Sequence, residues 1–275
     1  MIKFGVVSDI HSEFWQQSDL TKIGGMIKKE VAEADIILLA GDIGSGLQSV
    51  KIANHLWPDK PVCIVAGNHE YYNNIVDDVV HGMSQMSRAV KNVRFLNRGV
   101  YINNDFEKPV RVIGATLWTD YNLYGTQHIS MIHAAKNLND FYCIFKNIQR
   151  DLIKPNEVLQ WHIRDRDWIQ QEIDKPFDGF TVVMTHHCPV SFADHPSFVG
   201  GQNSPCFLSN LDKMFTRDDL DLVVWGHTHY SVDKTFCNTR FVSNQVGYLS
   251  TPYGFYQGTK GQISETGDFG TIVEL

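Results

Sequence analysis

The feature that most constrains the fold of this 275-residue chain is a set of apolar runs that each end in polar residues. Continuous apolar runs separated by helical stretches are typical of strands buried on both faces in an α/β sheet. The runs are residues 2–9, 35–42, 61–70, 180–187 and 220–229. The polar residues at their ends are Asp9, His11, Asp42, Asn68, His69, Glu70, His186, His187, His227 and His229. Because ligands of open α/β sheets bind at strand ends, we expect these groups to meet in one crevice.

The rest of the chain predicts further strands and one helical region. Three short apolar runs are spaced as an antiparallel meander, at residues 93–97, 100–103 and 110–118. Residues 119–175 are polar, helical and rich in aromatic side chains, which predicts a helical insertion or cap over one edge of the sheet. The glycines and small polar residues of 253–270 favour a loosely ordered segment. The length predicts a single elaborated domain over residues 1–275.

The composition restricts the partners of the chain. No apolar run approaches the roughly 18 residues that a membrane span requires, and the N-terminus enters a strand-like run without a signal-peptide pattern. The five cysteines form no C-x-x-C pair, which indicates reduced thiols. A net charge of −7 does not favour nucleic acid, whose phosphates are bound by clustered Lys and Arg. We therefore expect a cytoplasmic protein that binds neither membrane nor nucleic acid; its oligomeric state stays open.

The donor atoms at the strand ends suit divalent metals of the first transition row. They are imidazole nitrogens, carboxylate oxygens and an amide oxygen, without a thiolate. Taken singly, each could have an ordinary structural role, since Asp9 could cap the next segment, Asp42 could occupy a turn and Asn68 a left-handed turn position. Together they would require five unrelated turns to carry metal-type ligands by accident, so we favour a metal site. The ligands suffice for two ions, an arrangement that clamps the attacking and leaving oxygens of a phosphoryl displacement.

The order of the motifs resembles that of the calcineurin-like metallophosphoesterases. Asp-x-His, Gly-Asp, Gly-Asn-His-Glu, a strand-end His and Gly-His-x-His follow one another between residues 9 and 229. The resemblance implies an α/β fold in the form of a four-layer α/β/β/α sandwich, whose two mixed sheets carry a dinuclear metal centre. The implied ligands are Asp9, His11 and His229 for one metal and Asn68, His186 and His227 for the other, with Asp42 bridging both. His69 would be the catalytic histidine, with an acidic partner near Asp42 or at Glu70.

The resemblance implies hydrolysis of a phosphodiester, by in-line attack of a hydroxide that bridges two divalent metals. Serine/threonine protein phosphatases of this superfamily continue the Gly-Asp motif as G-D-x-x-D-R-G, whereas this chain reads GDIGSGLQS at residues 41–49. The departure disfavours a protein phosphatase. A phosphomonoesterase and a nucleotide pyrophosphohydrolase remain alternatives. The expected metals are Mn, Fe, Zn, Ni or Co, with Mn supporting activity in vitro, and the expected substrate is a small phosphoester or a nucleotide.

Three further residues are candidates for substrate contacts. His187 follows a predicted ligand, and it either touches the substrate or packs in the interior. Tyr121 and Tyr124 lie in the aromatic region, where such rings either stack on a nucleobase or pack the region onto the sheet. The alternative from another class is a catalytically silent binding scaffold of the same fold. A scaffold should have lost ligands or His69, and this chain retains all of them, so metal content would separate the two.

Overall fold

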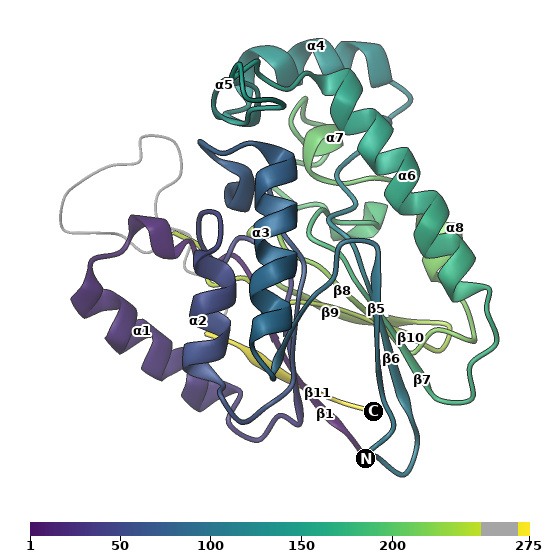
Figure 1. The fold of residues 1–275 in the computed structure, drawn as a ribbon. Coiled ribbons are helices and arrows are strands. Elements are labelled where there is room, and N and C mark those ends of the chain that lie inside the picture. Colours follow the sequence, from purple (N-terminus) through teal and green to yellow (C-terminus); the bar gives the residue numbers. More distant parts are fainter. Residues whose placement is uncertain (249–268) are drawn as a thin grey trace.

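Two mixed sheets form the middle of the computed structural model, which describes residues 1–248 and 269–275 except the side chains of 17–19 (Figure 1). The first sheet has the strand order β11 (Thr271–Glu274), β1 (Lys3–Val7), β2 (Ile36–Leu39), β3 (Val62–Ile64) and β4 (Val93–Phe95). Strands β1 to β4 run parallel, and β11 is antiparallel to β1. The predicted loosely ordered segment 253–270 lies outside the described residues, apart from its last two positions.

The second sheet has the strand order β5 (Gly99–Asn103), β6 (Val110–Gly114), β7 (Phe180–Met184), β8 (Leu222–Val224), β10 (Thr239–Ser243) and β9 (Val232–Phe236). Its inner strands are parallel and its two outer strands antiparallel. The predicted antiparallel meander of three strands is wrong in one respect. β4 pairs in parallel with β3 in the first sheet, so only β5 and β6 form the predicted antiparallel pair. Leu96 accounts for the crossing, since it is buried between the two sheets just after β4.

Helices cover the outer faces of both sheets and complete the predicted four layers (Figure 1). Beside the first sheet lie α1 (Gln17–Glu30), α2 (Gln48–Leu56) and α3 (Val76–Ala89), and along the second lie α6 (Pro155–Ile173) and α8 (Asp212–Phe215). At one end of the sheets α4 (Gln127–Asn137), α5 (Asp140–Cys143) and α7 (Ser204–Phe207) gather. Short 3₁₀ helices span Ser12–Phe14, His69–Tyr71 and Ser191–Ala193. Residues 119–175 therefore contribute α6 to an outer layer and α4 and α5 to the end where the strands finish.

Alternation along the strands fills the spaces between the layers. On β2, Ile36 and Leu38 lie between the sheets, whereas Ile37 and Leu39 face the helices, as the period of two in a strand requires. Burying one such side chain stabilises the fold by about 1.5–3 kcal/mol. Because both faces of these strands are buried, their sequences are continuous apolar runs.

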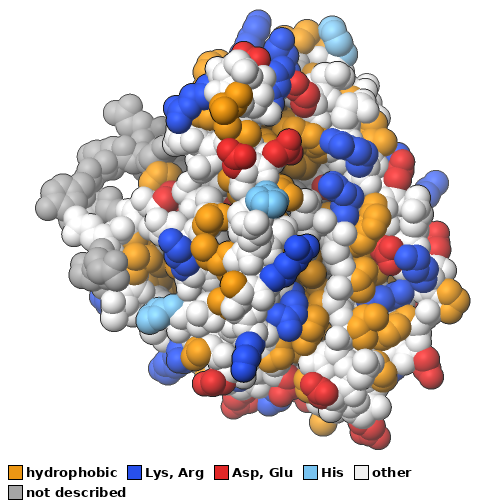
Figure 2. All heavy atoms as spheres, in the orientation of Figure 1, with side chains coloured by type: hydrophobic (Ala, Val, Ile, Leu, Met, Phe, Trp, Pro, Cys, Tyr) orange, Lys and Arg blue, Asp and Glu red, His pale blue; other side chains and the backbone are white. Residues whose placement is uncertain are grey.

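Backbone pairing beyond the strands joins the two sheets near their carboxyl ends. Ser8 N–H donates to the carbonyl of Asn244 at 3.0 Å, and Val246 N–H donates to the carbonyl of Ser8 at 3.0 Å. The residues after β1 and after β10 are thereby held side by side. Within the described part of the chain no helix is long and apolar enough to cross a membrane. Acidic and basic side chains both occur over the face in Figure 2.

Candidate metal centre

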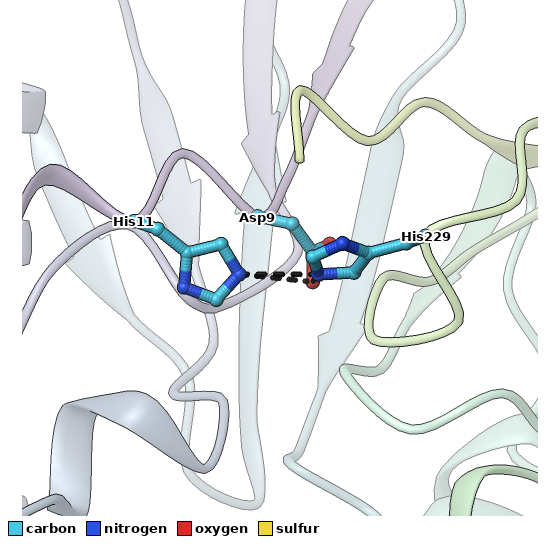
Figure 3. A group of neighbouring side chains, drawn as sticks. All are labelled: Asp9, His11 and His229. Atoms are coloured by element: carbon cyan, nitrogen blue, oxygen red, sulfur yellow. Dashed lines mark hydrogen bonds and ion pairs between the residues drawn. The ribbon is translucent and has the colours of Figure 1, made fainter. Parts of the chain in front are cut away.

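Three of the predicted ligands, Asp9, His11 and His229, form a first ligand group. They come from the ends of β1 and β8, and their side chains point toward one another (Figure 3). His11 Nε2 lies 3.1 Å from His229 Nε2, and Asp9 Oδ1 lies 3.3 Å from His229 Nε2. The structure thus brings together residues 218 positions apart.

Asn68, His186 and His227 form a second ligand group, with Asp42 between it and the first. His186 Nε2 lies 3.1 Å from Asn68 Oδ1 and 3.2 Å from His227 Nδ1. Asp42 Oδ2 lies 3.5 Å from His186 Nε2 and 3.8 Å from His11 Nε2. One carboxylate oxygen therefore faces both groups, which is the position a bridging ligand must occupy.

The spacing of these donor atoms fits divalent ions. Two imidazole nitrogens that are each about 2.1 Å from one ion and about 3.1 Å apart subtend roughly 95° at it, an angle open to four- to six-coordinate metals. The carboxylate and imidazole ligand atoms within each group lie within 4.8 Å of one another. The carboxylates of Asp9 and Asp42 are buried against imidazoles. Neither has a lysine or arginine partner in the described part of the chain. Cations bound here would compensate that buried charge.

Hydrogen bonds behind two of the histidines fix the tautomer that a metal needs. His186 Nδ1 lies 2.8 Å from the carbonyl oxygen of Ala40, which can only accept, so Nδ1 carries a hydrogen and Nε2 is the nitrogen available to a metal. His11 Nδ1 lies 3.3 Å from Glu13 Oε1 and is oriented in the same way. Both rings therefore turn Nε2 toward the centre. Burial alone would lower the pKa of His186, but the charge of Asp42 raises it to about 9, so a bound cation would displace a proton from that nitrogen.

The backbone at the ligands is in the left-handed region. Positive φ values between 50° and 69° occur at Asp9, His11, Asp42, His227 and His229. Each such non-glycine residue costs on the order of 1 kcal/mol or more, and such strain clusters at functional sites. Gly226 is required here by close approach, since a Cβ would lie 2.5 Å from Asp9 Oδ2 and 2.8 Å from the Ala40 carbonyl oxygen. This close approach accounts for the glycine of the Gly-His-x-His motif.

Glu70 supports the backbone around the bridging carboxylate. It is fully buried and accepts hydrogen bonds from the backbone N–H groups of Asp42 (3.0 Å), Ile43 (2.9 Å) and Gly67 (2.7 Å). Burial and the charge of Asp42 raise the pKa of Glu70 to about 7. Its carboxylate ties the ends of β2 and β3 together, so it does not serve as the acidic partner of His69.

The acidic partner of His69 is Glu13, which the sequence interpretation missed. His69 Nδ1 lies 2.8 Å from Glu13 Oε1, and the His69 ring stacks on Tyr72 with centroids 4.1 Å apart. His69 Nε2 lies 4.0 Å from Asp42 Oδ2 and 3.3 Å from the hydroxyl of Tyr248. Burial alone would lower the pKa of His69, but the charge of Asp42 and the hydrogen bond with Glu13 raise it to about 9. In the metal-free protein the imidazole is therefore protonated at neutral pH.

A second unpredicted carboxylate, Asp140 at the start of α5, orients the amide of Asn68. Asp140 Oδ1 accepts from Asn68 Nδ2 at 2.9 Å and from the Tyr72 hydroxyl at 2.8 Å. With its NH₂ group held there, Asn68 turns Oδ1 toward His186. The Glu13 signal was visible as an acidic residue two positions after His11, whereas Asp140 is 72 residues from Asn68 and carries no local signal.

The three residues predicted to contact the substrate lie away from the pocket beside the two ligand groups. His187 is buried, with its ring centroid 4.0 Å from that of His227. Tyr121 is buried in the apolar cluster beneath the helices. Tyr124 is exposed, and its hydroxyl donates to Asp194 at 3.0 Å. None of the three is among the described residues that line the pocket beside the ligands.

That pocket has a volume of about 300 Å³ and opens beside His69 and His229. Its far wall comes from the α4–α5 connection and from residues 194–208. Tyr248 also lines it, with its ring stacked on His11 at a centroid distance of 4.3 Å. A molecule bound in this pocket would touch predicted metal ligands and His69 at once.

Comparison with known proteins places the chain in a family. The family of calcineurin-like phosphoesterases matches residues 2–231. Uncharacterized protein L509 of Acanthamoeba polyphaga mimivirus is 27% identical over 267 residues, which cover 88% of this chain and 90% of that protein.

Two solved structures show the same fold. Phosphopantetheinyl hydrolase (PptH) of Mycobacterium tuberculosis superposes with a TM-score of 0.68 at 16% identity, covering 90% of this chain and 89% of that one. GAP50, the anchor in the inner membrane complex of Plasmodium, has a TM-score of 0.50 at 10% identity, covering 96% and 79%. With a family match over most of its length and a buried histidine and aspartate cluster that fits metal, the chain belongs to the calcineurin-like phosphoesterases.

Proposed function

We propose that the protein hydrolyses a phosphodiester in the pocket beside the two ligand groups. The observation that carries this proposal is the position of Asp42, one oxygen of which faces both groups within 4 Å of their imidazoles. Two divalent cations held there would supply Lewis acidity at phosphorus and a nucleophile formed from water at neutral pH. Asp9, His11 and His229 would hold one cation, and Asn68, His186 and His227 the other, with Asp42 shared.

His69 is the proposed general acid. Its Nδ1 is engaged by Glu13, so Nε2 is the nitrogen left to face the pocket. As the water oxygen bonds to phosphorus and the bond to the leaving oxygen breaks, the Nε2 proton passes to that oxygen. Glu13 keeps the imidazole protonated and in this orientation.

The charge of the pocket supports a diester as substrate. A phosphomonoester carries about two negative charges at neutral pH, whereas a diester carries one. Apart from the two proposed cations and His69, which act on the reacting phosphoryl group, the described residues that line the pocket include no lysine or arginine to neutralise the second charge. This agrees with the missing arginine after the Gly-Asp motif. The structurally similar hydrolase of M. tuberculosis is named for a phosphopantetheinyl substrate. A phosphopantetheinyl diester should therefore be among the substrates tested.

A binding scaffold of the same fold is the competing function, and the Plasmodium structure described as an anchor is an example of the fold in such a setting. The complete ligand set and the hydrogen-bonded His69 favour catalysis, because a scaffold has no need of either. Metal content separates the two functions, since the enzyme should bind about two divalent ions per chain.

The direct test compares bis(4-nitrophenyl) phosphate with 4-nitrophenyl phosphate, using protein reconstituted with Mn²⁺ and protein stripped of metal. We expect turnover of the diester to exceed that of the monoester by about tenfold or more, because no lysine or arginine of the described lining pairs with the second charge of the monoester. We expect no turnover by the stripped protein. Faster hydrolysis of the monoester would reverse the proposed preference, and full activity without metal would refute the mechanism.

A further inference from the structure

The pocket extends well beyond the reacting centre, and its far wall has a consistent chemistry. Three asparagine side chains line it, from Asn137, Asn139 and Asn203, together with the rings of Phe198 and Phe207. Asn137 Nδ2 and Asn203 Oδ1 are engaged with His133, so the atoms left for a ligand are Asn137 Oδ1, Asn203 Nδ2 and the amide of Asn139, which together still include donors and acceptors. Such a wall matches an uncharged group that combines flat or apolar surface with hydrogen-bonding atoms.

The charged groups of this wall are carboxylates. Asp140 receives hydrogen bonds from the amide of Asn68 and the hydroxyl of Tyr72, and Asp194 receives one from the hydroxyl of Tyr124. All of these donors are neutral, so none of them offsets the charge of an ionised carboxylate. The basic side chains among the described lining residues are imidazoles, of which His195 alone lies outside the candidate metal centre and its catalytic histidine.

We infer that the ester group entering this pocket is uncharged, and that substrates carrying a further phosphate in that group are selected against. The inference rests on the proposed phosphodiesterase function. It names the substrate class as phosphodiesters with a neutral, hydrogen-bonding arm, and it excludes nucleotide pyrophosphates. A second phosphate would lie against two carboxylates with no lysine or arginine of the described lining to compensate it.

The test uses two esters that differ by one phosphate, the 4-nitrophenyl esters of thymidine 5′-monophosphate and of thymidine 5′-diphosphate. In both, the water oxygen bonds to the phosphorus that carries the nitrophenyl group, and 4-nitrophenolate leaves. We expect kcat/KM for the first ester to exceed that for the second by about tenfold or more. A third substrate, the 4-nitrophenyl ester of N-acetylaminopropyl phosphate, carries an open-chain amide in place of the nucleoside. The larger kcat/KM of these two neutral substrates shows whether the pocket prefers a nucleoside or an open-chain amide.

A charge added to the wall should weaken the selection. In Asn139→Lys we expect the preference to fall below about threefold, because the new cation compensates the extra phosphate. Ala135→Lys is the matched control, since it adds the same charge on exposed α4 outside the pocket and should keep the preference. Equal use of both thymidine esters by the wild-type protein would overturn the inference. If bis(4-nitrophenyl) phosphate is hydrolysed in that same experiment, the proposed function stands and the inference alone fails; inertness toward every ester removes both.

Discussion

The two ligand groups border the pocket through different residues, the first through His229 and the second through Asn68 and His227. The side chain of His229 is 16% exposed, whereas His186 is fully buried and His227 nearly so. Different carboxylates support the two groups, with Glu13 against His11 and Asp140 against Asn68. Glu13 also contacts His69, whereas Asp140 links the second group to α5. The two ligand groups of the candidate centre therefore have different carboxylates behind them, one local in sequence and one distant, and Tyr72 lies between these carboxylates because it stacks on His69 and donates to Asp140.

Removing the shared ligand should affect both groups at once. In Asp42→Asn we expect the metal content to fall below one ion per chain, because each group loses a charged ligand. Diesterase activity should drop by roughly a thousandfold or more, since electrostatic stabilisation of the transition state is lost with the ions. Metal analysis and steady-state kinetics on the same sample measure both. Retention of two ions would contradict the bridging position.

The sequence singled out the seven candidate ligands and His69 because each follows an apolar run that could be read as a strand, and the structure brings these residues together. The fold layers followed from the same runs together with the family resemblance. What it could not predict were contacts made across the fold. Glu13 is two residues from His11, but its reach to His69 depends on a turn that the left-handed residues create. The position of β4 was predicted wrongly because the pairing of this short strand depends on its neighbour Leu96. Leu96 is buried between the two sheets, a contact that the local sequence does not reveal.

His69→Ala should separate catalysis from metal binding. We expect kcat to fall by about 10²- to 10⁴-fold for a diester with an alkyl leaving group, which needs a proton. For a 4-nitrophenyl ester the loss should be smaller, because nitrophenolate leaves without one. Metal content should stay at about two ions. Equal losses for both leaving groups would argue against the general-acid role, and full activity would rule the mechanism out.

The outer carboxylates should each weaken one ligand group. We expect Asp140→Ala to lower the affinity of one of the two ions by about 10- to 100-fold, since partners behind metal ligands contribute about this much. Asp140→Asn keeps an acceptor and should recover part of the loss. Glu13→Gln should weaken the other ion instead. Titration calorimetry with Mn²⁺ resolves the two sites, with exposed Asp167→Asn as the unaffected control. Loss of the same ion in both variants would contradict the assignment of one carboxylate to each ligand group.

The smallest expected effect is on stability, and its pH dependence reports the Glu13–His69 pair without metal. The pKa of His69 is raised from 6.5 to about 9, so its contribution is complete below pH 6.5 and is lost as the pH rises toward 9. The pKa of Glu13 is lowered from 4.5, despite burial, by hydrogen bonds with His11 and His69, so its contribution is lost as the pH falls below 4.5. The pair therefore stabilises the protein most between these limits.

At about pH 6 the charge-assisted hydrogen bond should contribute on the order of 1.5 kcal/mol, less than a fully buried pair because the Glu13 side chain is 18% exposed. For a chain of this size that corresponds to roughly 3–6 °C in Tm between the metal-free wild type and Glu13→Gln. The difference should shrink as the pH approaches 9, because neutral His69 gains little more from glutamate than from glutamine. Thermal melts of the EDTA-treated proteins at pH 6 and 9 measure it. A difference that stays constant across this range would mean that His69 is already neutral at pH 6, and Glu13 would then act by orienting the ring rather than by keeping its proton.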